Sequence, residues 1–426
     1  MTPVNPSTTP FALATLFSDP ELQKLGIGMF QHQQSDHSVS FSATAGGISL
    51  AKDFHFTDGS YYIDASYHLT FPKGNRSDWG YLVLPVGGTA LDFDGSDPLR
   101  SWEVVSYQND SVTRKAEDKL KEPALVQQGN TSWLAFGNRY FAMATINASQ
   151  INPDVVFAKD PGFTGGYLRY PLLLKPGQQT LDFAVKFYVG PKDYSHLSKV
   201  VGLRELINYG TFSKIAYPIL ELLKFFYRWV HNYGIAIIVL TIFVRLLFYP
   251  LSAKGAKSMK AMQKLQPQIT ALKEKYKDDM QRFNQEQMAL FKAHKVNPMG
   301  GCIPMLLQLP VFIALYAVLG YSIELFHAPF FGWIQDLSAK DPFYILPVLM
   351  GVSMLGQQKL TTTAMMDPVQ QKMMLFMPVI MTVFMAKLPS GLTLYIFLST
   401  LLGIVQQLMV NRDGKQERLV QAPTRA

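Results

Sequence analysis

Cysteine is nearly absent from this chain, and charged residues are scarce. Its 426 residues include one cysteine, which excludes a disulfide framework and a metal site built from several cysteines. Only 16% of the residues are charged and 48% are hydrophobic, so a disordered polyelectrolyte is also excluded. The nucleotide-binding pattern Gly-x-x-x-x-Gly-Lys-Ser/Thr does not occur, and no nucleophile–base pair or metal-ligand set stands out. We therefore expect a protein that is not an enzyme and that needs no cofactor or metal.

Charge divides the chain into two unlike halves. Residues 1–210 carry 17 Lys and Arg against 20 Asp and Glu, whereas residues 211–426 carry 22 against 11. The positive half also holds long apolar runs. Its charge therefore predicts a membrane protein with basic cytoplasmic loops, in preference to a nucleic-acid-binding protein.

Residues 1–205 are expected to form a water-exposed β-sandwich. Short runs of alternating apolar and polar residues are separated by turn clusters such as Asp58-Gly59 and Lys175-Pro176-Gly177. An acidic loop that could in principle bind calcium is interpreted as a solvated turn; its residues are Asp92, Asp94 and Asp97. The expected strands are Ser38–Ala43, Ile48–Phe56, Tyr61–Phe71, Trp79–Val86, Ser132–Ile146, Gly166–Leu174 and Leu181–Val189.

Residues 206–231 connect this domain to the apolar half. Charged residues recur along 214–230 at helical spacing and share one face, while Phe and Trp residues cover the rest. This pattern is typical of an amphipathic helix that lies in the membrane interface.

Five membrane spans are expected in residues 232–410, because each apolar run reaches or nearly reaches about 17–25 residues. The spans are placed at about 233–251, 303–323, 343–358, 373–388 and 392–409. The segment 252–300 carries ten Lys and Arg against four acids, so it and the tail 411–426 are assigned to the cytoplasm and the β-domain to the opposite side. The fold class is thus mixed: an all-β domain followed by a five-helix transmembrane core.

An exported N-terminal domain requires a targeting signal. Residues 1–30 contain no basic segment followed by an apolar one. We therefore expect this sequence to be a piece that lacks an N-terminal signal or anchor helix.

The cytoplasmic segment 252–300 is expected to form a helical hairpin. Met262, Leu265, Ile269, Leu272 and Tyr276 recur at spacings of three and four, and Met280, Phe283 and Leu290 continue the pattern. Pro267 is expected to kink the first helix. The basic face could be merely solvated, or it could contact RNA, anionic phospholipids or an incoming chain. The candidate contacts are Lys254, Lys257, Lys260, Lys264, Lys273 and Arg282.

Arg245 is the outstanding residue of the apolar half. It lies inside the first span, and no acidic residue occurs in any of the five spans. A charged side chain at this depth costs about 2.5–3.5 kcal/mol unless it finds water or polar groups. Thr241 lies one turn away on the same face. Further polar groups lie in or near the other spans: Gln308, Ser353, Gln357, Ser399, Thr400, Gln406 and Gln407. These residues predict a positive, hydrated pocket, although snorkelling to the interface is the simpler alternative.

Several ordered segments resemble the YidC family of membrane protein insertases. The resemblance runs from about Tyr209 to Met409, and the N-terminal region is similar to the family's periplasmic domain by pattern. The segments that carry it are Ile242-Phe243-Val244-Arg245, Tyr249-Pro250-Leu251, Lys295-Val296-Asn297-Pro298-Met299-Gly300-Gly301-Cys302, Gln308-Leu309-Pro310, Asp336-Leu337-Ser338, Asp341-Pro342, Asp367-Pro368-Val369-Gln370-Gln371-Lys372 and Leu388-Pro389-Ser390-Gly391-Leu392 with Tyr395.

The resemblance implies a multi-pass bacterial inner-membrane insertase without enzymatic turnover, with a periplasmic β-supersandwich and a cytoplasmic C-terminus. Arg245 matches the single arginine of the family's hydrophilic groove, and Thr241 and Tyr395 match positions that face substrate. The implied partners are nascent membrane proteins, ribosome–nascent chain complexes and the Sec translocon. Ile396 stands where relatives often carry a second aromatic residue.

Two other functions remain open on the residues alone. A solute transporter with an extracytoplasmic ligand-binding domain would hold a small molecule between its spans. An assembly factor would use the spans only as an anchor, and Arg245 would then be dispensable.

Overall fold

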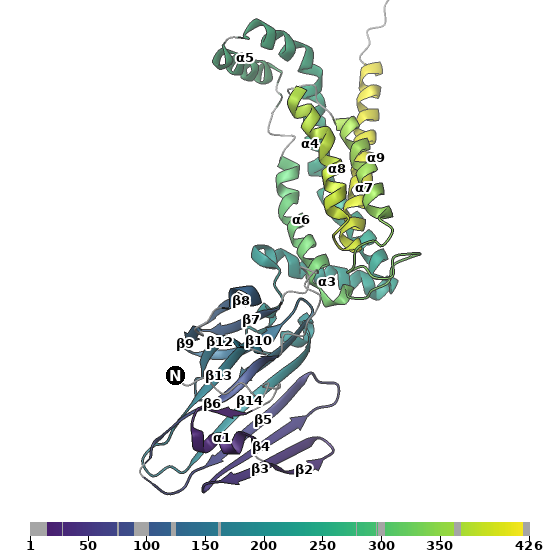
Figure 1. Cartoon of the computed structure of the whole chain (residues 1–426). Helices are drawn as coiled ribbons and strands as arrows, with labels where there is room; N and C mark the ends of the chain where they lie inside the picture. Colours follow the sequence, from purple (N-terminus) through teal and green to yellow (C-terminus); the bar gives the residue numbers. More distant parts are fainter. Residues whose placement is uncertain are drawn as a thin grey trace, which may run out of the picture. The chain divides into compact units, whose positions relative to one another are not determined.

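The computed structural model describes residues 15–27, 29–74, 76–88, 102–120, 125–160, 163–277, 279–294, 296, 303–361 and 368–420. The chain divides into two compact units, Met1–Asn208 and Tyr209–Ala426, here called the β unit and the helical unit (Figure 1). The acidic loop with Asp92, Asp94 and Asp97 lies outside the described residues.

The β unit consists of two antiparallel sheets. The five-stranded sheet has the order β1-β6-β13-β12-β9, and the nine-stranded sheet has the order β2-β3-β4-β5-β14-β11-β10-β7-β8. Its elements are β1 (Leu16–Phe17), α1 (Pro20–Ile27), β2 (Gln31–Ser35), β3 (Ser38–Ala45), β4 (Ile48–Phe56), β5 (Tyr62–Thr70), β6 (Asp78–Gly88), β7 (Glu103–Gln108), β8 (Ser111–Ala116), η2 (Glu117–Lys119), β9 (Leu125–Gln127), β10 (Thr131–Gly137), β11 (Phe141–Asn147), β12 (Asp154–Asp160), β13 (Phe163–Leu173), β14 (Thr180–Pro191), α2 (Tyr194–Leu197) and η3 (Leu203–Leu206).

Buried and exposed side chains alternate along the strands, so the two sheets pack their apolar faces against each other around one core. In β14, Leu181, Phe183 and Val185 are buried while the residues between them are exposed. These side chains join Leu84 of β6 and Leu168 of β13 in the same cluster, so both sheets contribute to it. The predicted N-terminal β-sandwich is therefore confirmed.

One predicted strand was wrong in its extent. The run Ser132–Ile146 is a hairpin of β10 and β11, paired in register from Trp133 opposite Ile146 to Gly137 opposite Ala142. Both strands are rich in apolar residues, so the sequence pattern predicted a single strand where the structure has two. The turn is built by Asn138, whose side-chain oxygen accepts hydrogen bonds from the backbone N–H groups of Tyr140 and Phe141, each at 2.9 Å.

Lys52 breaks the apolar pattern of the sandwich. It occupies an inward position of β4, between the buried residues Leu50 and Phe54, and only 8% of it is exposed. Its Nζ lies 4.2 Å from the ring centroid of Phe30. Burial lowers the pKa of Lys52 to about 8 from an ordinary 10.5.

Replacing Lys52 with methionine is expected to stabilise the β unit near neutral pH. The unfolded chain holds this proton up to about pH 10.5 and the folded chain only up to about pH 8, so the charged lysine lowers stability below pH 8 and the loss is relieved as the pH rises through this interval. We expect Lys52→Met to raise the free energy of unfolding by about 1–3 kcal/mol at pH 7. Urea unfolding of the full chain in detergent measures this change in the free energy of unfolding.

Lys175→Met is the matched control, because Lys175 is exposed at a turn of the same unit. The advantage of Lys52→Met should shrink between pH 7 and pH 10. An advantage that is independent of pH would mean that packing, and not the charge of Lys52, is responsible.

The helical unit contains five long helices at the positions of the predicted spans. Asn232 begins the first of them, since its side chain accepts a hydrogen bond from the Ile235 N–H at 3.0 Å. The elements are η4 (Gly210–Phe212), α3 (Ser213–Val230), α4 (Tyr233–Lys275), α5 (Met280–Ala293), α6 (Ile303–Tyr321), η6 (Ile323–Leu325), α7 (Ile345–Thr361), α8 (Pro368–Met385) and α9 (Ser390–Val420).

The five helices pack in a definite order. α4 packs against α9, α9 against α7, and α7 against α8, while α3 lies against both α4 and α6 (Figure 1). α8 therefore packs chiefly on α7, although a short turn connects it to α9. Within the described residues, two helical segments are long and apolar enough to cross a membrane, Tyr233–Met262 and Ser390–Met409. The segments Leu309–Tyr321 and Leu375–Met385 are apolar but shorter.

The first helix of the predicted hairpin is not a separate element. α4 continues through Pro250 and Pro267 as one helix of 43 residues, and α5 packs against its distal part. Leu265, Ile269, Phe283 and Phe291 form the buried contact between the two. Met280, which was expected in this contact, is exposed, because it is the first residue of α5.

Candidate functional site

Arg245 points from α4 to α9 and binds one residue there. Its Nη2 donates hydrogen bonds to the Ser399 carbonyl oxygen at 2.6 Å and to the Ser399 Oγ at 2.8 Å, and its Nε donates to the same Oγ at 3.2 Å. Arg245 is half-buried and Ser399 is buried. The guanidinium thus satisfies part of its hydrogen-bonding capacity inside the bundle, where an unpaired charge is costly.

A second polar contact joins the same two helices. Gln406 Nε2 donates to the Ser252 Oγ at 2.6 Å, and the two residues are 154 positions apart, as are Arg245 and Ser399. The constant separation means that α4 and α9 run parallel and in register. Ser252 was not among the predicted groove residues, because a lone serine near the end of a span carries no pattern that marks it.

Gly403 leaves room for this cluster. A Cβ at Gly403 would lie 2.7 Å from the Gln357 Nε2 and 3.6 Å from the Arg245 Nη2. The Gln357 side chain of α7 and the Arg245 guanidinium therefore approach the same turn of α9. Nothing in the sequence distinguishes Gly403 from an ordinary small residue in an apolar helix.

The other predicted groove residues are less accessible. Thr241 is 1% exposed and donates to the Ile237 carbonyl oxygen at 2.6 Å, and Tyr395 is 3% exposed. Substrate can reach these two side chains only if the helices around them separate. Gln308 lies in α6, and its side chain falls outside the part of the structure that is described.

The basic residues of the hairpin are mostly directed to solvent. Lys254, Lys257, Lys264, Lys273 and Arg282 are exposed, and Lys260 is half-buried. The Arg282 guanidinium also lies 5.7 Å from the ring centroid of Tyr276. The positive charge is thus spread over both helices of the hairpin and is available to an anionic surface.

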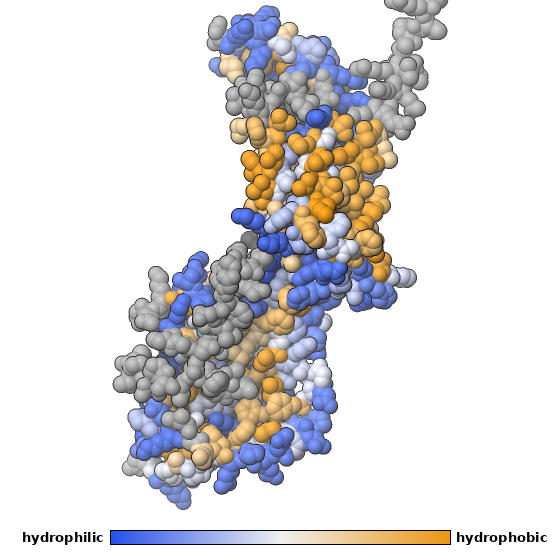
Figure 2. All heavy atoms as spheres, turned by 45° about the vertical axis from the view of Figure 1, so that its right-hand side comes forward, coloured by the Kyte–Doolittle hydropathy of each residue, from blue (hydrophilic) through white to orange (hydrophobic). Residues whose placement is uncertain are grey.

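Hydrophobic side chains cover the middle of the helical unit. Figure 2 shows them as a band, with hydrophilic residues at both ends of the unit. Exposed members include Ile242, Phe243, Leu246 and Leu247 of α4, Val348, Leu349 and Val352 of α7, Leu375, Phe376, Val379, Ile380, Val383 and Phe384 of α8, and Val405 and Leu408 of α9. Exposed apolar area of this extent is expected to face lipid.

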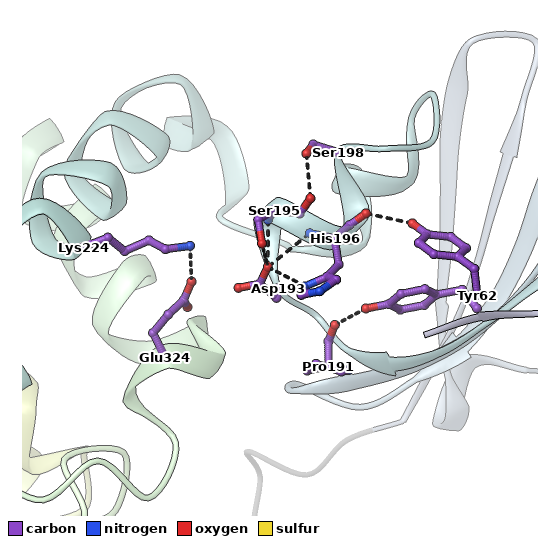
Figure 3. Close-up of polar contacts among 9 residues, drawn as sticks. Tyr62, Pro191, Asp193, Ser195, His196, Ser198, Lys224 and Glu324 are labelled. Atoms are coloured by element: carbon purple, nitrogen blue, oxygen red, sulfur yellow. Dashed lines mark hydrogen bonds and ion pairs between the residues drawn. The ribbon is translucent and has the colours of Figure 1, made fainter. Parts of the chain in front are cut away.

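The amphipathic helix α3 is fixed to the segment after α6 by one ion pair, and the chain shortly before α3 is fixed to the same segment by one hydrogen bond. Lys224 Nζ lies 3.1 Å from Glu324 Oε1 of η6 (Figure 3), and Tyr209 and Ser322 share a hydrogen bond of 2.9 Å between their hydroxyl groups. Glu324 is 8% exposed at its side chain and Lys224 21%. Trp229 of α3, 75% exposed, points away from the bundle.

A Ser-His-Asp grouping in the β unit is a helix cap and not a catalytic triad. Asp193 Oδ1 accepts from the Ser195 hydroxyl and from the backbone N–H groups of Ser195 and His196, and it lies 3.0 Å from His196 Nδ1 (Figure 3). Serine and histidine both bind the same carboxylate, whereas catalysis needs a serine–histidine contact. Among the described residues, no group of three His, Cys, Asp or Glu could hold a metal ion.

An apolar multi-helix unit with one arginine held between two helices, joined to a β-sandwich, defines a transmembrane protein with a folded extramembrane domain. Residues 26–222 match the family model described as YidC periplasmic domain, and residues 225–417 match the one described as 60Kd inner membrane protein. The chain belongs to the YidC family of membrane protein insertases.

Curated relatives agree over most of the chain. The membrane protein insertase YidC of Geotalea daltonii is 42% identical over 386 residues, which cover 88% of this chain and 71% of the relative. That of Citrifermentans bemidjiense is 46% identical over 386 residues, covering 88% and 70%. A crystal structure of an active YidC insertase with its first transmembrane domain resolved has a TM-score of 0.41 at 21% identity, covering 89% of this chain and 79% of that one.

The predicted family and the insertase function are thereby confirmed, and the family models describe an inner membrane protein with a periplasmic domain. The groove residues, the number of spans, the orientation of the termini, and the ribosome, Sec and phospholipid contacts stay predictions.

Proposed function

We propose that this chain accepts the hydrophilic segment of a nascent membrane protein beside Arg245 and releases the adjoining apolar segment into the bilayer. The observation that carries the proposal is the half-buried Arg245, which is placed within the apolar band and bonded to a neutral residue, Ser399. A positive group without an acidic partner attracts polar or anionic segments of a substrate.

A hydrophilic substrate segment enters the membrane at lower cost beside Arg245, because polar groups of the protein replace the water that it loses. A hydrophilic segment in hydrocarbon leaves its hydrogen-bonding groups unsatisfied, at several kcal/mol each. Polar partners gather at the contact between α4 and α9, here called the α4–α9 seam. They are Arg245 and Ser252 of α4 and Gln406 of α9, together with Gln357, which approaches α9 from α7. Burial of the substrate's apolar span in lipid then supplies the driving force, assisted by the membrane potential acting on its charges.

The proposal includes a topology. All five helices α4, α6, α7, α8 and α9 cross the inner membrane, the β unit is periplasmic, and α5, the distal part of α4 and the C-terminus are cytoplasmic. The exposed basic residues of the hairpin support this orientation, because positive loops are retained in the cytoplasm. α3 lies in the periplasmic interface with Trp229 among the lipid headgroups.

The basic hairpin receives the incoming chain. Its exposed lysines suit ribosomal RNA at the exit of a ribosome–nascent chain complex, as well as anionic phospholipids. Substrates that also use the Sec translocon would reach the same α4–α9 seam by a lateral path.

Site-specific photocrosslinking to a stalled nascent membrane protein tests the proposal. A probe at Gln406, which is half-buried on the seam, is expected to form strong adducts, because its neighbour Ser252 places it beside the path past Arg245. A probe at Val352, 62% exposed on α7, is the lipid-facing control. Equal adducts at both positions, or none at Gln406 with ribosomes present, would favour the transporter or anchor function.

A further inference from the structure

We propose that Ser399 is a positioning residue for Arg245: it holds one edge of the guanidinium so that the opposite edge is presented to substrate. The inference rests on the proposed function of Arg245 in binding the substrate. In this arrangement α4 provides the cation, Arg245, and α9 orients it through Ser399.

Ser399 engages three of the five N–H donors of Arg245. The two Nη2 donors reach the Ser399 carbonyl oxygen at 2.6 Å and its Oγ at 2.8 Å, and the Nε donor reaches the same Oγ at 3.2 Å. Within the described residues, the Nη1 donors have no protein acceptor, and Nη1 is not among the buried atoms that lack a partner. Nη1 is therefore the accessible edge of the guanidinium.

The seam is shaped to hold this one orientation. Ser399 is 8% exposed, so its hydroxyl and carbonyl oxygen are fixed by packing and cannot follow a mobile side chain. Gly403, one turn further along α9, lets the Arg245 Nη2 approach to 3.6 Å from the position of a Cβ. Without Ser399, the long side chain would be free to turn toward the membrane interface.

The two N–H groups left on Nη1 determine what is bound. They suit a hydrogen-bond acceptor, either a carboxylate or a backbone or amide carbonyl oxygen in the hydrophilic segment of the substrate. A donor fixed in advance binds more tightly than one that must be ordered on binding. Ser399 therefore acts on the affinity of Arg245 for substrate and not on the presence of its charge.

The test compares two neighbouring hydroxyl groups of α9. Ser399→Ala is expected to lower the insertion rate in proteoliposomes by about threefold to tenfold, as for a weakened charge-assisted hydrogen bond, and Ser399→Thr is expected to retain the rate. The matched control is Thr400→Val, since Thr400 is equally buried but donates within its own helix, to the Ile396 carbonyl oxygen at 2.8 Å. Ser399→Cys is a second variant if Ser399→Ala does not fold.

Combination with Arg245→Ala separates positioning from packing. If Ser399 acts through Arg245, the double variant inserts at the rate of Arg245→Ala alone. A further loss in the double variant, or a wild-type rate for Ser399→Ala where Arg245→Ala is impaired, would overturn the inference and leave the proposed function intact. A wild-type rate for Arg245→Ala would remove the proposed function and the inference together.

Discussion

Arg245→Ala is expected to lower insertion of substrates with a polar or acidic flanking segment by about tenfold or more, because a charge-assisted hydrogen bond contributes about 1.5–3 kcal/mol. The same change should not destabilise the helical unit. It removes a cation whose burial is unfavourable, and Ser399 keeps its place in α9. Loss of activity without loss of stability indicates a binding residue, since substitution of a packing residue would lower both the activity and the stability of the protein.

The measurement is protease protection of a radiolabelled substrate in proteoliposomes, together with the thermal unfolding midpoint in detergent. Arg245→Lys keeps the charge but lacks the forked donors, so an intermediate rate is expected. Arg228→Ala on α3 is the control, because Arg228 is an exposed arginine of the same unit. Wild-type insertion by Arg245→Ala would exclude the arginine from the mechanism while leaving membership of the family untouched.

Glu324→Ala is expected to destabilise the helical unit by about 2–3 kcal/mol. Glu324 is 8% exposed at its side chain and lies 3.1 Å from Lys224 Nζ, so its removal leaves an ammonium group facing a site of low polarity. Breaking a fully buried ion pair costs about 3–5 kcal/mol, and the partial exposure of Lys224 reduces this. The change should also loosen α3, because Glu324 connects it to the end of α6.

A charge exchange makes this prediction specific. The double variant Lys224→Glu with Glu324→Lys should recover most of the lost stability, whereas each single reversal should be worse than Glu324→Ala. Lys214→Glu is the matched control, since Lys214 is an exposed lysine on the same helix. Thermal unfolding in lipid nanodiscs measures the stability of all five variants. Failure of the exchange to restore stability would show that packing at this position outweighs the charge.

The sequence predicted the β unit best where one strand ends in a clear turn. β4 occupies Ile48–Phe56, as expected from its alternation and the Asp58-Gly59 turn. β7 and β8 were missed, although the turn between them, Asn109-Asp110, has positive φ at both residues and is a recognisable hairpin signal. β12 was also missed, because its pairing with β13 is set by the sheet and not by its own pattern.

At the candidate site, the sequence identified Arg245 and a set of polar residues in the other spans, but not which of them binds it. Arg245 stands out because charge is rare in an apolar run. Its contact with Ser399 and that of Ser252 with Gln406 join residues 154 positions apart, and no local pattern encodes the register of two helices. The burial of Thr241 and Tyr395 likewise depends on how α4 and α9 pack.

The continuity of α4 gives the molecule a mechanical property. Arg245 and the hairpin residue Leu265 belong to the same helix, about 20 residues apart, which is a lever of about 30 Å. A tilt of about 5° imposed at the hairpin displaces the other end by about 2.5 Å, close to the length of a hydrogen bond. Pro250 lies between the two points and removes one backbone hydrogen bond, so it is where the lever bends most easily. A force on the hairpin therefore reaches the contact between Arg245 and Ser399 only to the extent that α4 does not bend at Pro250.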